Sequence, residues 1–230
     1  MLESALARVA PASATTGRPA DVLRWIAAAF FLSALAFGGI AWAMGDVFFL
    51  RLATEALIYG GLALSVDLLL GRTGLLPLGQ ALFFGLGAYV SALVLKHWDA
   101  SFWLALGVAM AASALAGLLG GLIAIRSKGV YFALISFGLA QVVSKVIYNT
   151  RELGASDGLI GVPAAQVGGA LTSAAPLGFF LLVLTLIFVI WALLSLLMDT
   201  PFGRQLAAVR GNEQRLAFIG VDPWRVKLAV

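Results

Sequence analysis

The sequence contains no cysteine, a single histidine and few charged residues. Without cysteine the chain has neither disulfides nor thiolate metal sites, and His97 alone cannot build a histidine-rich metal centre. Charged residues make up 11% of the 230 residues, against about a quarter in soluble domains. With 62% hydrophobic residues, the chain is too apolar for a water-soluble fold.

Motifs of catalysis and nucleotide binding are also missing. No His/Asp/Glu cluster falls within an apolar run, and the sequence has neither a Gly-x-Ser-x-Gly elbow nor a Walker A motif. The chain is therefore not expected to be an enzyme or to bind ATP, metal or another cofactor itself. Its net charge of +4 follows from basic residues around the apolar runs, so no nucleic-acid partner is expected.

Long apolar runs dominate what is present. Each approaches 20 residues, the length needed to cross a bilayer core of about 30 Å as a helix. Residues 1–20, rich in Ala, Ser, Thr and Pro, are predicted to form a disordered cytoplasmic tail. The prediction for residues 21–230 is an all-α, polytopic transmembrane bundle with spans at about 22–45, 48–70, 75–96, 102–125, 130–149 and 176–198.

Basic residues fall mainly on one side of these spans. With a cytoplasmic N-terminus, the outer segments hold only Arg51, Lys96 and Arg151, and Lys145 lies within a span. The inner segments then hold Arg8, Arg18, Arg24, Arg72, Arg126, Lys128, Arg204, Arg210, Arg215, Arg225 and Lys227. The positive-inside rule predicts this orientation.

The third apolar segment begins irregularly. Residues 71–80 carry Gly71, Gly74, Pro77 and Gly79 among apolar residues, and Gly85 and Gly87 follow. Irregular backbone at membrane depth survives where protein or a water-filled cavity satisfies it. The segment is either a broken helix beside a translocation path or a tight turn with glycines for close packing.

Two spans carry small residues at helical spacing. They are Ala105, Ala109, Ser113, Gly117 and Gly121 in the fourth span, and Ser136, Ala140 and Ser144 in the fifth. Small residues let two helices approach closely in lipid, so we interpret both stripes as packing faces, with the lining of a pore as the less favoured alternative.

Charges within spans suggest pairs. Glu55 and Lys145 lie at similar depths near the outer boundary and could pair; alternatively Glu55 pairs with Arg51, and Lys145 reaches the headgroups. Asp67 and Gln80 lie near the inner side and could form a hydrogen bond that fixes the irregular segment.

Residues 150–175 form a long outer segment, predicted to shape the outer mouth, with a short helix or a re-entrant piece. Residues 201–222 are predicted to form a basic, amphipathic cytoplasmic helix with an apolar face of Phe202, Leu206, Val209 and Phe218. Such a helix either docks a soluble partner or rests on anionic lipid. A new apolar run begins at residues 227–230, so later spans are expected to be absent from this sequence.

Four groups of residues, in this order, resemble one family: the LivM-type permease subunits of ATP-binding-cassette (ABC) importers for branched-chain amino acids. The groups are Gly71-x-x-Gly74 with Leu78-Gly79-Gln80-Ala81-x-Phe83-Phe84-Gly85-x-Gly87-Ala88-Tyr89; Gly129-Val130-Tyr131-Phe132-Ala133-Leu134; Asp157-Gly158-Leu159-x-Gly161-Val162-Pro163; and Pro201-Phe202-Gly203-Arg204 with Ala208-Val209-Arg210-Gly211-Asn212-Glu213, Ala217 and Gly220-Val221.

The resemblance implies a multi-pass protein of the bacterial inner membrane that works with a homologous second permease subunit (LivH-like), two cytoplasmic ATPase subunits carrying ATP and Mg, and a periplasmic substrate-binding protein. Residues 201–222 would be the coupling helix, with Phe202, Gly203, Arg204, Arg210, Glu213, Arg215 and Gly220 coupling to the ATPase. Arg204 and Glu213 could instead brace the loop internally.

A small amino acid would pass by alternating access along Ser65, Gly79, Gln80, Gly85, Gly87 and Ser136, with Asp157 and Gly158 in the outer loop. A urea or short-amide ABC permease is the close alternative. An ion-coupled secondary transporter is a further alternative; it would need an essential acid near the midplane.

Overall fold

A computed structural model describes residues 19–98, 101–127, 129–168, 171–172 and 174–230 of the protein. Of the tail predicted for residues 1–20, residues 1–18 lie outside the described residues. Pro19 and Ala20 belong to the first described helix. The described elements are α2 (Pro19–Ala43), α3 (Val47–Asp67), η1 (Leu68–Thr73), α4 (Gln80–Trp98), α5 (Phe102–Ala124), α6 (Val130–Asn149), η2 (Arg151–Leu153), η3 (Ala155–Asp157), β1 (Gln166–Gly168), β2 (Leu171–Thr172), α7 (Pro176–Asp199), α8 (Pro201–Gly211), α9 (Glu213–Phe218) and α10 (Pro223–Leu228).

In the described part of the chain, six helices are long and apolar enough to cross a membrane. They are Arg24–Ala43, Val47–Thr73, Gln80–Trp98, Phe102–Ala124, Val130–Asn149 and Pro176–Asp199. The predicted all-α bundle of six spans is confirmed, and most boundaries agree within a few residues. The largest difference is the third span, which starts at Gln80 because residues 74–79 are not helical.

Local chemistry explains where several helices begin. The Asp46 carboxylate caps α3 by accepting from the Phe48 amide at 3.0 Å, after Gly45 turns the chain with φ of 70°. Ser101 caps α5 by accepting from the Leu104 amide. Prolines occupy the first turns of α7 and α8. An amide hydrogen in this position has no acceptor within the helix, so its absence in proline costs nothing.

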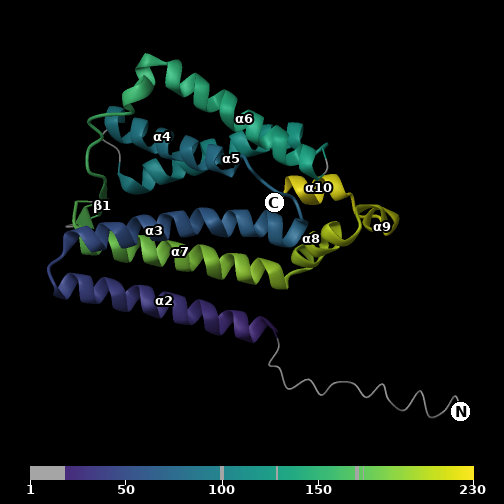
Figure 1. The fold of residues 1–230 in the computed structure, drawn as a ribbon, viewed down its shortest axis with the longest axis horizontal. Helices are drawn as coiled ribbons and strands as arrows, with labels where there is room; N and C mark the ends of the chain where they lie inside the picture. The colour runs from purple at the N-terminus through teal and green to yellow at the C-terminus, as the bar shows by residue number, and fades with distance from the viewer. Residues whose placement is uncertain (1–18, 99–100, 128, 169–170, 173) are drawn as a thin grey trace, which may run out of the picture.

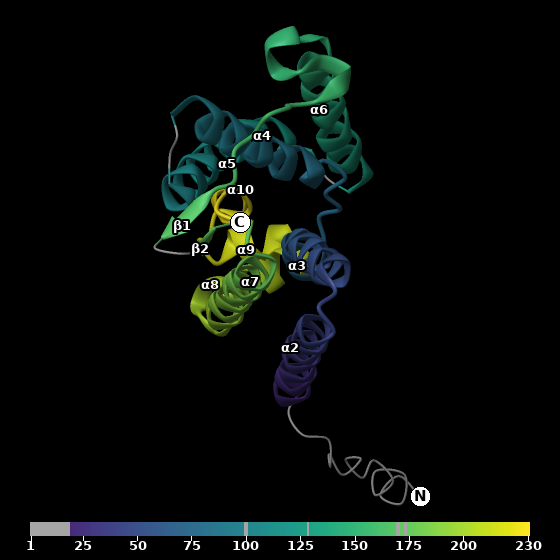
Figure 2. The ribbon, with the colours of Figure 1, turned by 90° about the vertical axis from the view of Figure 1, so that its left-hand side faces the viewer.

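The long helices form two groups (Figures 1 and 2). In the first, α2, α3 and α7 enclose a core of Ala41, Leu50, Leu57, Phe180, Val183, Leu184 and Ile187. Gly38 in α2 makes room for the Phe180 ring, which a Cβ at that position would overlap. In the second group, α4 packs against α5, and α6 lies beside both (Figure 2).

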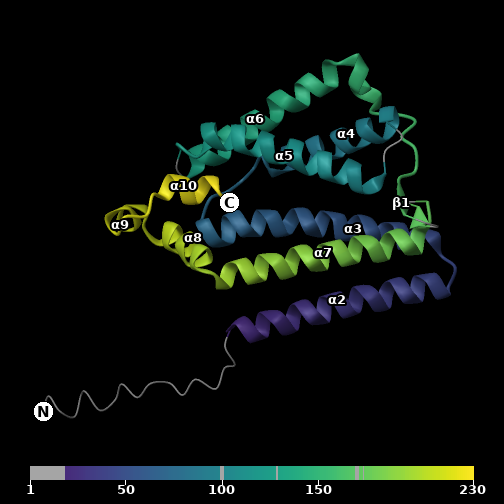
Figure 3. The same ribbon diagram turned by 180° about the vertical axis from the view of Figure 1, so that it is seen from behind.

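The two ends of the bundle differ. The helices α8, α9 and α10 gather at one end, where α2 begins, and the β1–β2 hairpin lies at the other (Figures 1 and 3). We call these the α8–α10 end and the hairpin end. At the first, Arg24 of α2 pairs with Asp199 of α7 at 3.1 Å. At the second, the Lys96 ammonium donates to the Ile160 carbonyl at 3.0 Å, and the Trp103 indole donates to the Val167 carbonyl at 2.9 Å.

The segment at residues 150–175 contains structure that differs in part from the prediction. Two short 3-10 turns, η2 and η3, fit the expected short helical piece, but the antiparallel β1–β2 hairpin was not predicted. Its strands have three and two residues, too short to leave an alternating hydrophobic pattern in the sequence.

Candidate functional site: the α8–α10 unit, the α3–α4 junction and the α4–α6 groove

Residues 201–228 form a separate unit of three short helices at one end of the bundle (Figure 1). The prediction of one helix over 201–222 is therefore wrong. Asn212 causes the break: its backbone is extended, with φ of −166°, and its side chain accepts hydrogen bonds from the amides of Gln214 and Arg215. An asparagine in this role starts a new helix rather than continuing the old one.

The apolar face of this unit is mostly buried within the chain itself. Leu206 and Val209 are 0% and 3% exposed and form a small core with Leu216 and Val226. They are therefore not available to a partner, contrary to the prediction of an outward anchor. Phe202 packs against the same core.

The exposed apolar residues lie instead at the tip of the unit. Phe218 is 89% exposed and Ile219 is 75% exposed, both at the end of α9. The turn that follows contains Gly220, with φ of 85°. Figure 1 shows α9 as the part of the unit farthest from the long helices. Arg215, on the same short helix, is also exposed.

Other charged residues of the unit make contacts within the chain. The Arg210 guanidinium donates to the Gly71 carbonyl oxygen at 2.5 Å. Lys227 is 6% exposed and pairs with the Glu213 carboxylate. Arg204 reaches the Asp199 carbonyl at 3.5 Å. These contacts support the alternative in which Arg204 and Glu213 brace the loop internally. Arg210 makes the same kind of contact.

Gly203 has a different role, because a Cβ there would overlap the Met198 backbone. It lets α8 fold back closely against the end of α7.

The α3–α4 junction is irregular, as predicted. The last turns of α3 widen into a π-helix, η1, which ends at Gly74 with φ of 73°. Residues 74–79 then run without helix, and alternate residues are buried: Thr73, Leu75, Pro77 and Gly79. A Cβ at Gly79 would overlap the Ser136 carbonyl, so this segment lies directly against α6.

The predicted hydrogen bond between Asp67 and Gln80 is not formed. The Gln80 amide donates instead to the Ser65 hydroxyl at 3.1 Å, while Asp67 is exposed. Ser65 and Asp67 are two residues apart on α3 and so point in different directions, and Ser65 is the one that faces α4. The start of α4 is nevertheless fixed against α3, as the sequence suggested.

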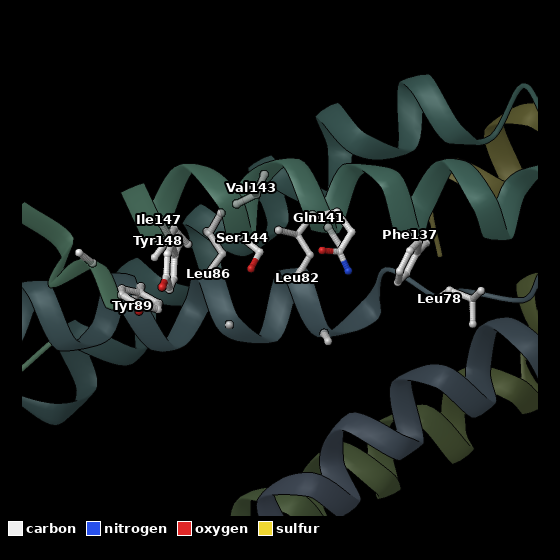
Figure 4. Close-up of a pocket in the computed structure, with 14 residues that line it drawn as sticks. Leu78, Leu82, Leu86, Tyr89, Phe137, Gln141, Val143, Ser144, Ile147 and Tyr148 are labelled. Carbon is white, nitrogen blue, oxygen red and sulfur yellow. The ribbon is translucent and has the colours of Figure 1, made fainter. Parts of the chain in front are cut away.

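A groove of about 410 Å³ lies between α4 and α6 (Figure 4). Gly85, Ala140 and Ser144 line it, together with Gln141, which the sequence analysis did not select. Its remaining lining residues are Leu78, Ala81, Leu82, Leu86, Tyr89, Phe137, Val143, Ile147, Tyr148 and Ala155. Within the described chain, Ala140 and Ser144 therefore face this groove, where the sequence had suggested a packing face.

Most of the other small residues do pack; Gly117 of α5 is the exception, since a Cβ there would meet nothing within 4 Å. Ala105 and Ala109 of α5 are buried, and a Cβ at Gly87 of α4 would approach the Ser113 hydroxyl to 2.9 Å. Ser136 lies against Gly79 and donates to its own helix at Ala133. The stripe on α5 is thus a helix-packing face, as predicted.

Comparison with known proteins gives the family. Residues 48–230 match the family described as the permease component of branched-chain amino acid transport systems. The chain belongs to this permease family. Among curated proteins, the permease is 30% identical over 225 residues to the "High-affinity branched-chain amino acid transport system permease protein LivM" of Salmonella typhimurium (strain LT2). It is equally similar to the protein of that name from Escherichia coli (strain K12).

Both alignments cover 86% of the permease and 52% of the relative, so the chain spans about half the length of the curated relatives it matches. No solved structure is significantly similar to the permease. The family is one of membrane transport components, which accords with a LivM-type permease.

The structure does not bring Glu55 and Lys145 of the permease together. Lys145 lies 5.8 Å from the centre of the Tyr148 ring, and Glu55 is exposed on α3, where it lines a pocket with Arg51. Neither has an ion pair with any other residue that the structure describes. This placement favours the alternative in which Lys145 reaches the headgroup region.

Asp157 and Gly158 of the permease lie in the segment at residues 150–175, at the hairpin end. Asp157 closes the η3 turn, with its amide donating to the Gly154 carbonyl and its carboxylate accepting from Ser156 at 3.1 Å. Gly158 has φ of 72°, a conformation that glycine adopts without strain. Both residues are therefore explained by the shape of the loop.

Proposed function

We propose that the chain is the permease subunit of an ATP-driven importer that moves branched-chain or other small amino acids by alternating access. The exposed tip of α9 carries the proposal: a Phe218 that is 89% exposed projects from the basic end of a bundle belonging to a transport-permease family. A large aromatic residue left uncovered at such a position suits a protein partner.

The partner at this tip is an ATPase subunit. Phe218 and Ile219 supply an apolar anchor, and Arg215 supplies a positive charge beside it. A short helix that lays an apolar tip into a groove is a common mode of recognition. Phe202, Gly203, Arg204, Arg210, Glu213 and Gly220 then serve coupling by holding the tip in place, through the contacts described above.

Motion at the tip has a route to the long helices. The Arg210 guanidinium holds the end of η1 at Gly71, and η1 continues α3 without a break. Ser65 of α3 in turn accepts from Gln80 at the start of α4. ATP binding at the partner would favour one arrangement of these elements and substrate delivery the other, since each must bind the two states differently to drive transport.

The remaining partners follow from this role. A homologous second permease subunit completes the pathway, and a periplasmic substrate-binding protein delivers the amino acid to the hairpin end. The basic residues at the α8–α10 end favour, by the positive-inside rule, a cytoplasmic location for that end, in a bacterium with an inner membrane. Both ATPases would meet the complex there.

The direct test is uptake of radiolabelled leucine into proteoliposomes that hold the chain with its second permease and the two ATPases. Leucine-loaded binding protein is supplied outside, and ATP inside. Uptake should require ATP and persist when ionophores collapse all ion gradients. Uptake that needs an ion gradient and ignores ATP would instead identify a secondary transporter, and uptake of urea in place of leucine would identify the short-amide alternative.

A further inference from the structure

The α4–α6 groove runs along much of the two helices. It extends from Leu78, just before α4, along α4 to Tyr89, and it follows α6 from Phe137 to Tyr148, a stretch of roughly 16 Å at 1.5 Å per residue. It reaches Ala155 of η3 at the hairpin end. The groove therefore leads from the irregular α3–α4 junction toward the outer loop, over about half the depth of a bilayer core of about 30 Å.

Two polar side chains of α6 point into this groove without a partner. Figure 4 shows the Gln141 amide and the Ser144 hydroxyl directed toward α4. Within the described residues, no hydrogen bond to either side chain is present, whereas the hydroxyls of Ser65, Ser113 and Ser136 each donate to a carbonyl. Polar groups at membrane depth are costly unless something satisfies them.

Gly85 opens space opposite these groups. A Cβ at Gly85 would meet nothing within 4 Å, while a Cβ at Gly79 or Gly87 would collide with a neighbouring helix. Gly85 is therefore not needed for packing. The wall beyond it is apolar, formed by residues such as Leu82, Leu86 and Phe137.

A second groove, of about 400 Å³ between α3, α4, α5 and α7, differs in its polar groups. Its polar lining residues are Ser65, Gln80 and Ser113. Gln80 donates to Ser65, Ser65 to Leu62, and Ser113 to Phe83. This groove therefore offers a solute fewer unpaired polar groups than the α4–α6 groove.

We propose that the α4–α6 groove is a segment of the solute path that binds the transported amino acid, an inference that rests on the proposed function. Gln141 and Ser144 hydrogen-bond the solute's charged amino and carboxylate groups, and the apolar walls accept its side chain. The volume of about 410 Å³ lies in the range of small-molecule sites. Lipid tails could fill the space but would leave the amide and hydroxyl unsatisfied.

The absence of cysteine makes a direct test simple, because each introduced cysteine is the only thiol of the chain. Ser144→Cys is compared with Val146→Cys, which lies on α6 outside the groove. The assembled importer in membranes is treated with a charged, water-borne methanethiosulfonate. Since this reagent needs water, Ser144→Cys should react at least about tenfold faster than Val146→Cys. Leucine supplied with its binding protein and ATP should slow the reaction several-fold.

Equal slow reaction of both variants would overturn the proposal, as would fast reaction that leucine leaves unchanged. The first result would mean that lipid or a partner helix covers the groove.

A second measurement fills the groove. Gly85→Val should lower leucine uptake at least about tenfold while ATPase association remains normal, because the added methyls occupy solute space. Gly107→Val is the control, since a Cβ at Gly107 also meets nothing and Gly107 lines no part of the groove. Normal uptake by Gly85→Val would overturn the groove assignment alone. Absence of ATP-driven uptake in the unaltered complex would instead reject the proposed function.

Discussion

Arg210 of α8 and Gly71 of η1 are 139 residues apart in the sequence and are joined by a hydrogen bond of 2.5 Å. The acceptor is a carbonyl in the last turn of a π-helix, where the backbone hydrogen bonds do not have the regular α-helical spacing. The stem of Arg210 also covers Gly74, where a Cβ would lie 3.2 Å from the Arg210 Cγ. This relationship ties the α8–α10 unit to the α3–α4 junction.

Arg210→Ala should uncouple transport from ATP hydrolysis. The variant loses the link to Gly71 but keeps the exposed tip of α9, so the ATPases should still bind and hydrolyse ATP. We expect leucine uptake per ATP to fall about tenfold, the effect of losing one charged hydrogen bond.

The matched control is Arg225→Ala, which removes a positive charge from the same α8–α10 unit but only an exposed pair with Asp222 at 3.4 Å. Equal losses in the two variants would mean that charge, rather than the Gly71 bond, matters.

Phe218→Asp should weaken binding of the ATPase. It places a charge where we expect an apolar pocket of the partner, and losses of about 2 kcal/mol or more, roughly thirtyfold in Kd, are typical of central aromatic residues. Affinity is measured by titrating purified ATPase onto the permease in nanodiscs. Ile160→Asp, at the hairpin end and 71% exposed, serves as the control and should bind normally. Unchanged affinity in Phe218→Asp would exclude the α9 tip as the docking point.

The pair of Lys227 and Glu213 should stabilise the α8–α10 unit in a way that depends on both partners. The Lys227 side chain is 4% exposed and that of Glu213 is 26% exposed, so removing one partner leaves a poorly solvated charge. Single variants Glu213→Leu or Lys227→Leu are expected to cost about 3–5 kcal/mol in this unit.

The double variant Glu213→Leu/Lys227→Leu should recover much of that loss. The measurement is the rate of trypsin cleavage within residues 201–228, which rises as the unit opens. A double variant cleaved as fast as either single one would show that the pair does not act as a unit.

Gly79→Ala should destabilise the bundle, and Gly85→Ala should not. A Cβ at Gly79 overlaps the Ser136 backbone of α6, which cannot move without shifting the helix. Forcing atoms into a packed interface costs about 1–3 kcal/mol. The thermal midpoint of the detergent-solubilised permease should fall for Gly79→Ala and stay within error for Gly85→Ala. Similar midpoints for both would contradict the close approach of residue 79 to α6.

The spans were predictable because hydropathy alone decides which segments enter a bilayer. The irregular start of the third span was also visible, since Gly74, Pro77 and Gly79 oppose helix formation. The break at Asn212 could have been recognised too: a Gly-Asn-Glu sequence carries the signals of a helix end followed by a new cap.

The partners of side chains were harder to predict. Amphipathic spacing identified Leu206 and Val209 as an apolar face but could not show that Leu216 and Val226 of the same chain cover it. Likewise, Ser144 fits a small-residue packing stripe, and only the position of α4 shows that it lines a groove. The signal that could have revealed this groove is Gln141, a polar residue three positions from Ser144 within an apolar span.

Crosslinking from the tip of α9 is the most direct test of how energy reaches this permease. A photoreactive amino acid replaces Phe218 in the complex of chain, second permease and ATPases in native membranes, and the same substitution at Ile160 is the reference. The account predicts an ATPase adduct from position 218, and none from position 160. Adducts to the periplasmic binding protein from position 218, or none to any ATPase, would contradict it.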